Sequence, residues 1–109
     1  MRLKKAEIAT LPPKIEIAMK AGQVAADACT DDGGSANCDR VVIRMPGVRE
    51  AWVEGLRGYL QEAHGWHARG FHLDTPFAGI GNRRYAGVQA MYESLKNQGV
   101  DCYVYYQVD

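Results

Sequence analysis

Residues 71–108 read FHLDTPFAGIGNRRYAGVQAMYESLKNQGVDCYVYYQV, and this stretch decides the fold. The apolar run over residues 70–74 predicts a strand, and a proline and glycines then predict a connection. Residues 82–98 repeat apolar side chains at intervals of three and four, which is typical of an amphipathic helix. Residues 102–108 alternate in the manner of a strand. The stretch therefore predicts the order strand, helix, strand.

Two further elements are predicted upstream. Residues 40–45 contain three consecutive β-branched side chains, which predict a strand that is buried on both faces. Residues 48–63 place apolar side chains at helical spacing opposite a charged face, and Gly65 follows where a left-handed helix cap belongs. We therefore expect a helix, although Gly55 and Gly58 in its interior each cost about 1 kcal/mol relative to alanine.

Residues 14–29 fit two patterns. Polar and apolar residues alternate at the start, as in a strand, but Met19, Gly22 and Ala26 also fall on one helical face. The many alanines favour the helix. A face of small residues lets a helix approach another element closely, either within the fold or in a partner chain. We therefore count Met19, Gly22 and Ala26 as candidate interface residues.

Together these elements predict one small α/β domain, with a three-stranded sheet packed against two to three helices. Helical crossovers would allow parallel strands. A mixed sheet with helices on one face, an α+β arrangement, remains open. A length of 109 residues fits a single domain over residues 1–109. Residues 30–39 are rich in aspartate and glycine and are expected to form an exposed loop.

Composition narrows the range of partners. The chain has 13 basic and 13 acidic residues, and this balance makes nucleic acid an unfavoured partner because phosphate binding relies on excess positive charge. No apolar run is long enough to cross a membrane. Three cysteines do not suit a secreted disulfide framework, although pairing of Cys29 with Cys38 stays open. We expect a soluble, cytoplasmic protein.

Catalytic and metal signatures are weak. All three histidines, His64, His67 and His72, lie within nine residues and give a weak alternative for a metal site. Gly65 interrupts the helical spacing of the first two, and no cysteine or carboxylate stands at a recognisable zinc spacing. No local pattern indicates an activated cysteine or a serine nucleophile. We expect a non-catalytic protein without a cofactor.

The tyrosines of the last predicted strand suggest an interaction surface. Tyr103 and Tyr105 share one face of that strand, and tyrosine is enriched at protein interfaces. The leading interpretation is a small binding protein that acts on a protein partner or on a second copy of itself, as a homodimer.

An alternative function depends on the start of the helix at residues 82–98. Backbone N–H groups at a helix start can hold a phosphate, and nearby glycines let it approach. Arginines in the first turn are unfavourable at the positive end of the helix dipole and so imply an anion nearby. This alternative is a protein, conceivably an enzyme, that binds a phosphate, a nucleotide or nucleic acid. Its candidate residues are Gly79, Gly81, Asn82, Arg83 and Arg84.

Overall fold

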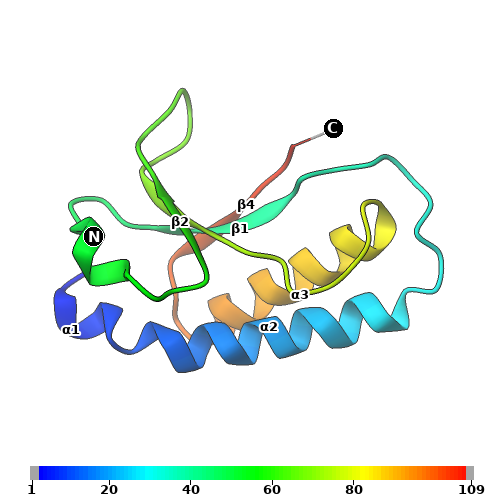
Figure 1. Cartoon of the computed structure of the whole chain (residues 1–109), viewed down its shortest axis with the longest axis horizontal. Helices are drawn as coiled ribbons and strands as arrows, with labels where there is room; N and C mark the ends of the chain where they lie inside the picture. The colour runs from blue at the N-terminus through cyan, green and yellow to red at the C-terminus, as the bar shows by residue number, and fades with distance from the viewer. Residues whose placement is uncertain (1–2, 108–109) are drawn as a thin grey trace.

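Two long helices cover one face of a four-stranded antiparallel sheet (Figure 1). The computed structural model describes residues 3–107, and within that range no helix covers the opposite face of the sheet. The sheet order is β2-β3-β1-β4. The elements are α1 (Lys5–Ile8), α2 (Leu11–Ala28), β1 (Arg40–Arg44), the 3₁₀ helix η1 (Glu50–Val53), β2 (Gly58–Gln61), β3 (Gly70–Leu73), α3 (Asn82–Asn97) and β4 (Cys102–Tyr105).

The core lies between the sheet and the helices. Alternate residues of each strand face it, because successive side chains of a strand point to opposite faces. Val41 and Ile43 of β1 belong to this core, whereas Val42 is equally buried on the other face. Prolines in the first turn of α2 are tolerated because the first N–H groups of a helix have no partner within it. Pro12 and Pro13 thus lie inside α2, next to its first residue.

The small-residue face of α2 packs against α3 inside the fold. A Cβ atom on Gly22 would lie 2.6 Å from Cγ of Met91 and 3.0 Å from the carbonyl oxygen of Gly87, so only glycine permits this approach. Met19, Gly22 and Ala26 are buried by this packing. The segment is thus helical up to Ala28, and the small face of the helix contacts another element of the same chain. Buried side chains offer no surface to a partner, so we do not retain these three as interface residues.

The helix predicted over residues 48–63 is wrong. This segment forms η1 and then β2. β2 is a strand that we did not predict, and it brings the number of strands in the sheet to four. Gly55 and Gly58 have φ values of +86° and +154°, outside the helical range, and they end one element and begin the next. A side chain on Gly58 would collide with the carbonyl oxygen of His72, so this position has to be glycine for β2 to pair with β3.

The sheet is antiparallel throughout, which corrects the expectation of three parallel or mixed strands. β2 returns directly into β3 as a hairpin, and β1 lies between β3 and β4. Of the α+β alternative, the fold class and the helices on one face are confirmed, but its mixed sheet is not. β4 ends at Tyr105, earlier than predicted, and Val108 lies outside the described residues. None of the helices in residues 3–107 combines the length and apolar character needed to cross a membrane.

Candidate functional site

One row of side chains runs across the uncovered face of the sheet, with one residue from each strand. Tyr59 lies opposite His72, His72 opposite Val42, and Val42 opposite Tyr103. Tyr105 shares the face of Tyr103, because residues two apart on a strand point the same way. We call this surface the aromatic face. It comprises Arg40, Val42, Arg44, Tyr59, His67, His72, Tyr103 and Tyr105.

The rings of the aromatic face are in contact with one another. Tyr59 stacks on His72 with ring centroids 5.0 Å apart, and His72 lies 5.7 Å from Tyr105 in a tilted arrangement. His67 reaches over from the β2–β3 hairpin and lies 4.2 Å from the Tyr105 ring. Such spacings are within the range of favourable aromatic contact. The rings thus form a continuous set of contacts, in which His72 is buried and Tyr59 is the most exposed ring, with 50% of its surface open to solvent.

Two arginines lie over the tyrosine rings. Cζ of Arg40 is 4.4 Å from the centroid of Tyr105, and Cζ of Arg44 is 4.6 Å from that of Tyr103, which are cation–π distances. Arg44 also forms an ion pair with Asp101 at 2.7 Å. Within residues 3–107, Arg40 pairs with no carboxylate; its Nη1 donates instead to the Cys38 carbonyl and to Gln107. The face therefore combines aromatic area with a charge that the described chain does not neutralise.

His72 is held in its neutral form. Nε of Arg40 donates a hydrogen bond to Nδ1 of His72 at 2.7 Å, which only an unprotonated Nδ1 can accept. Burial, the positive charge of Arg40 and that of His67 lower the pKa of His72 to about 4. The side chain is almost fully buried. His72 thus serves to orient Arg40 and to support Tyr59.

Tyr103 carries an unsatisfied polar group. Its hydroxyl is buried and finds no hydrogen-bond partner in the described part of the chain. Burial also raises the pKa of this phenol. Unpaired buried polar atoms cost free energy and are rare in folded proteins, so they are often associated with a functional role.

The β2–β3 hairpin rises from the same side of the molecule as the aromatic face (Figure 1). His64 and His67 close its tip through two backbone hydrogen bonds of 2.9 and 2.8 Å, and Trp66 between them is fully exposed. The base is fixed by Arg69, whose Nη1 donates to two backbone carbonyls of the β1–η1 connection. The hairpin thus presents a large apolar side chain on a firmly attached base.

The histidines are used for packing and turn formation. His67 contacts the Tyr105 ring in a tilted arrangement, His72 accepts from Arg40, and His64 belongs to the hairpin tip. No cluster of three or more histidine, cysteine or acidic side chains suited to a metal is found among the described residues.

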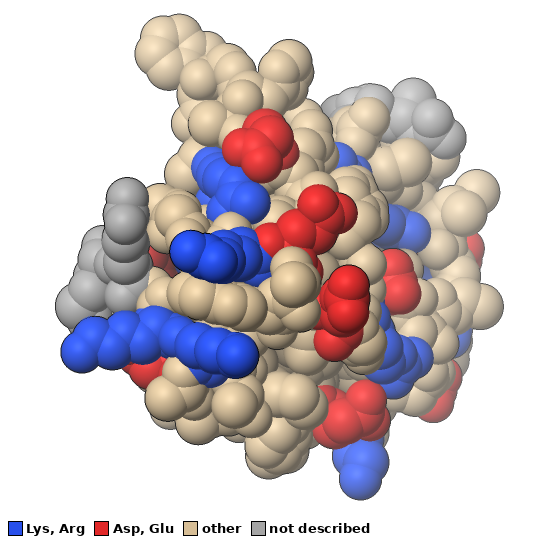
Figure 2. All heavy atoms as spheres, turned by 60° about the vertical axis from the view of Figure 1, so that its left-hand side comes forward, with Lys and Arg blue, Asp and Glu red and all other residues tan. Residues whose placement is uncertain are grey.

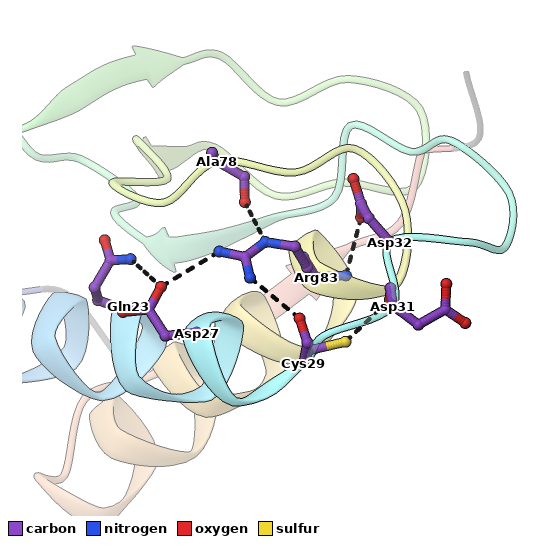
Figure 3. A network of polar contacts seen from close by, with 7 residues as sticks. All are labelled: Gln23, Asp27, Cys29, Asp31, Asp32, Ala78 and Arg83. Carbon is purple, nitrogen blue, oxygen red and sulfur yellow. Dashed lines mark hydrogen bonds and ion pairs between the residues drawn. The ribbon is translucent and has the colours of Figure 1, made fainter.

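The predicted anion site at the start of α3 contains a carboxylate of the chain itself (Figure 3). Asp32 accepts hydrogen bonds from the backbone N–H groups of Ile80 at 3.1 Å, Gly81 at 3.0 Å and Arg83 at 3.2 Å. These bonds lower the pKa of the Asp32 carboxyl. The anion implied by the first-turn arginines is therefore internal, and the amides that would hold a phosphate are engaged.

The arginines and Asn82 of this predicted site also have partners within the fold. Arg83 turns back to Asp27 at 3.3 Å and to the carbonyl oxygen of Cys29 at 3.1 Å, as Figure 3 shows. Arg84 donates to the Asp39 carbonyl, and the backbone N–H of Asn82 donates to Gly33. Gly79 adopts a φ of +120°, which lets the loop turn into α3. The acidic loop at residues 30–39 thus fastens α2 to α3.

Sequence reasoning placed Tyr103 and Tyr105 on one face, which the structure confirms, but it missed Tyr59 and Arg40. Tyr59 was assigned to a helix, and only the two glycines before it, Gly55 and Gly58, could have indicated otherwise. The role of Asp32 was also missed, because its partners lie about fifty residues along the chain.

Surface charge on one side of the molecule is mixed. The side turned forward in Figure 2 shows basic and acidic side chains interspersed, with no broad patch of a single sign. No protein-family model, curated protein or solved structure matches this chain. A function therefore has to be argued from the aromatic face and its surroundings.

Proposed function

We propose that this protein is a small non-catalytic binding protein that docks another protein through its aromatic face. The observation that carries the proposal is a sheet face without a covering helix in the described chain, which displays tyrosine rings in contact with arginines. Tyrosine and arginine are enriched at protein interfaces and supply much of their binding free energy. Trp66, which precedes His67 in the hairpin, is fully exposed and offers a further apolar side chain to a partner.

Charge favours a protein over nucleic acid as the partner. Binding to a phosphate backbone relies on several free cations, and the chain has a formal net charge of zero. Of the two arginines on the aromatic face, Arg44 is already paired with Asp101. One unpaired cation, Arg40, suits a carboxylate on a protein partner better than a phosphate chain.

The partner is a different protein or a second copy of this chain.

Cys29, Cys38 and Cys102 are free thiols. Free thiols suit a reducing compartment, and we propose that the protein acts in the cytoplasm.

A matched pair of tyrosine substitutions tests this function. Tyr59 and Tyr85 are 50% and 51% exposed, but Tyr59 lies on the aromatic face whereas Tyr85 lies on α3. We expect Tyr59→Ala to weaken association by about tenfold or more, as loss of an interface aromatic does, and Tyr85→Ala to leave it unchanged. The measurement is quantitative mass spectrometry of proteins captured by the wild type and by each variant, with analytical ultracentrifugation for self-association.

The proposal fails if both variants capture the same proteins at the same levels and assemble alike. It is also replaced if the wild type binds a labelled single-stranded oligonucleotide, if that binding declines steeply with salt, and if Arg40→Gln removes it.

A further inference from the structure

The outer edge of β2 has hydrogen-bonding groups that no other strand of residues 3–107 covers. β2 is a terminal strand of the sheet and pairs only with β3. The N–H of Asp74 donates to the carbonyl of Arg57, which makes this opposed pair a hydrogen-bonded one. Hydrogen-bonded and non-bonded pairs alternate along an antiparallel ladder, so the backbone groups of Gly58 and Leu60 point away from β3.

A cavity of about 270 Å³ lies beside this edge. Apolar side chains of η1, of the following turn and of the sheet line it, among them Val53, Leu56, Leu60 and Phe71. A strand added next to β2 would place the side chain opposite Leu60 on the same face of the sheet as Leu60, above this cavity. The volume is sufficient for one aliphatic side chain.

Two carboxylates, those of Glu50 and Glu54, also line the cavity. Both residues are exposed, and neither forms an ion pair within the described chain. Arg57, the nearest arginine in sequence to β2, is paired with Glu16 instead. The rim is therefore negative and favours a positively charged occupant.

We propose that the β2 edge binds an extended peptide segment of a partner protein as a fifth strand, with an apolar and a basic residue alternating on the face above the cavity. Backbone hydrogen bonds to Gly58 and Leu60 would supply affinity, and the cavity with Glu50 and Glu54 would supply selectivity, as in other cases of strand addition. This site goes beyond the function proposed above, because it uses the edge of the sheet and not its uncovered face.

The chemistry of the edge disfavours a second copy as the occupant. A second copy would present its own β2 strand, whose residues 58–61 read GYLQ and include no basic side chain to pair with Glu50 and Glu54. A basic segment supplies such a side chain.

A synthetic peptide provides a direct test. The probe is a capped, fluorescent peptide that repeats valine, threonine, lysine and threonine; its controls carry glutamate for lysine or N-methyl groups on alternate amides. We expect only the lysine peptide to bind by fluorescence anisotropy. We also expect it to slow hydrogen exchange of the Gly58 and Leu60 amides by about tenfold or more, because these amides become hydrogen-bonded.

Variants separate charge recognition from general adhesion. The double variant Glu50→Gln, Glu54→Gln should weaken binding of the lysine peptide by about three- to tenfold, as expected for partly exposed charge pairs. Glu93→Gln, an exposed change on α3, should not alter it.

Equal binding of the lysine and glutamate peptides, or protection that appears elsewhere than on β2, would overturn the inference. Protection of Gly58 and Leu60 by self-association without peptide would identify a second copy as the occupant and would overturn it as well. A protein partner that depends on Tyr59 and Tyr105 while the β2 amides stay unprotected would refute the edge site and leave the proposed function standing.

Discussion

Acid should destabilise this protein through His72, in a pH range where ordinary carboxylates are still charged. The buried imidazole accepts a hydrogen bond from Arg40 and has its pKa lowered from 6.5 to about 4. An unfolded chain exposes this histidine and binds a proton near pH 6.5, whereas the folded chain resists protonation until about pH 4. The free energy of unfolding must therefore fall as the pH drops from 6.5 to 4, and the loss is complete below 4.

The size of this effect follows from the shift. Each pKa unit corresponds to about 1.4 kcal/mol, so the full shift gives about 3 kcal/mol. The imidazole is almost fully buried, so solvent screens it little and we expect most of this, about 2 to 3 kcal/mol, to be measured.

Urea denaturation of the wild type and of His72→Gln, at intervals from pH 7 to pH 4, provides the measurement. Glutamine can still accept from Arg40 but does not titrate, so subtracting the two curves removes the contribution of the carboxylates. The difference should decline steadily on the acid side of neutrality. A flat difference, or an NMR titration that gives His72 an ordinary pKa, would refute the reasoning.

Three further predictions follow from the described contacts. Gly58→Ala should destabilise the fold by more than about 2 kcal/mol because its methyl group meets the His72 carbonyl, whereas Gly55→Ala, also with a positive φ but with open space around it, should cost about 1 kcal/mol; urea titration compares them. Asp32→Asn should lower the thermal midpoint by a few degrees at neutral pH, and scanning calorimetry should show this difference disappear as the wild-type carboxyl is protonated below its unfolded value of 3.8. The thiol of Cys102, whose pKa burial raises to about 11, should react with a disulfide reagent at pH 8 far more slowly than the other two thiols.

Much of the fold could be predicted because hydrophobic patterning matched the final packing. The consecutive Val41, Val42 and Ile43 indicated a strand buried on both faces, and β1 is the interior strand that contacts the core and the aromatic face. The apolar stripe of α3 and the alternation of β4 were equally clear. These signals are local, since burial acts on each element through its own periodicity.

The helix predicted from Val48 onward was wrong because the apolar residues fall at helical spacing while the backbone is not helical. Val48, Trp52 and Leu60 contact the core from a loop, a 3₁₀ turn and a strand respectively, so their regular spacing is a coincidence of three elements. Gly55 and Gly58 argued against a helix, because two glycines in one helix interior are costly. In the structure both adopt a positive φ. The tyrosine of β2 was lost from the candidate site by the same error.

The acidic loop at residues 30–39 is fixed by hydrogen bonds to the start of α3, although its composition suggests a flexible loop. The Asp32 carboxylate accepts hydrogen bonds from backbone N–H groups at the start of α3. Asn37 donates to the carbonyl oxygens of Ile80 and Gly81. An inserted tag or a fluorescent label would therefore destabilise the fold in this glycine-rich loop, although the loop's composition suggests a site that tolerates insertion. At the hairpin tip, an added Cβ on Gly65 meets nothing within 4 Å, so the fold tolerates an insertion there, although it would alter the surface around Trp66.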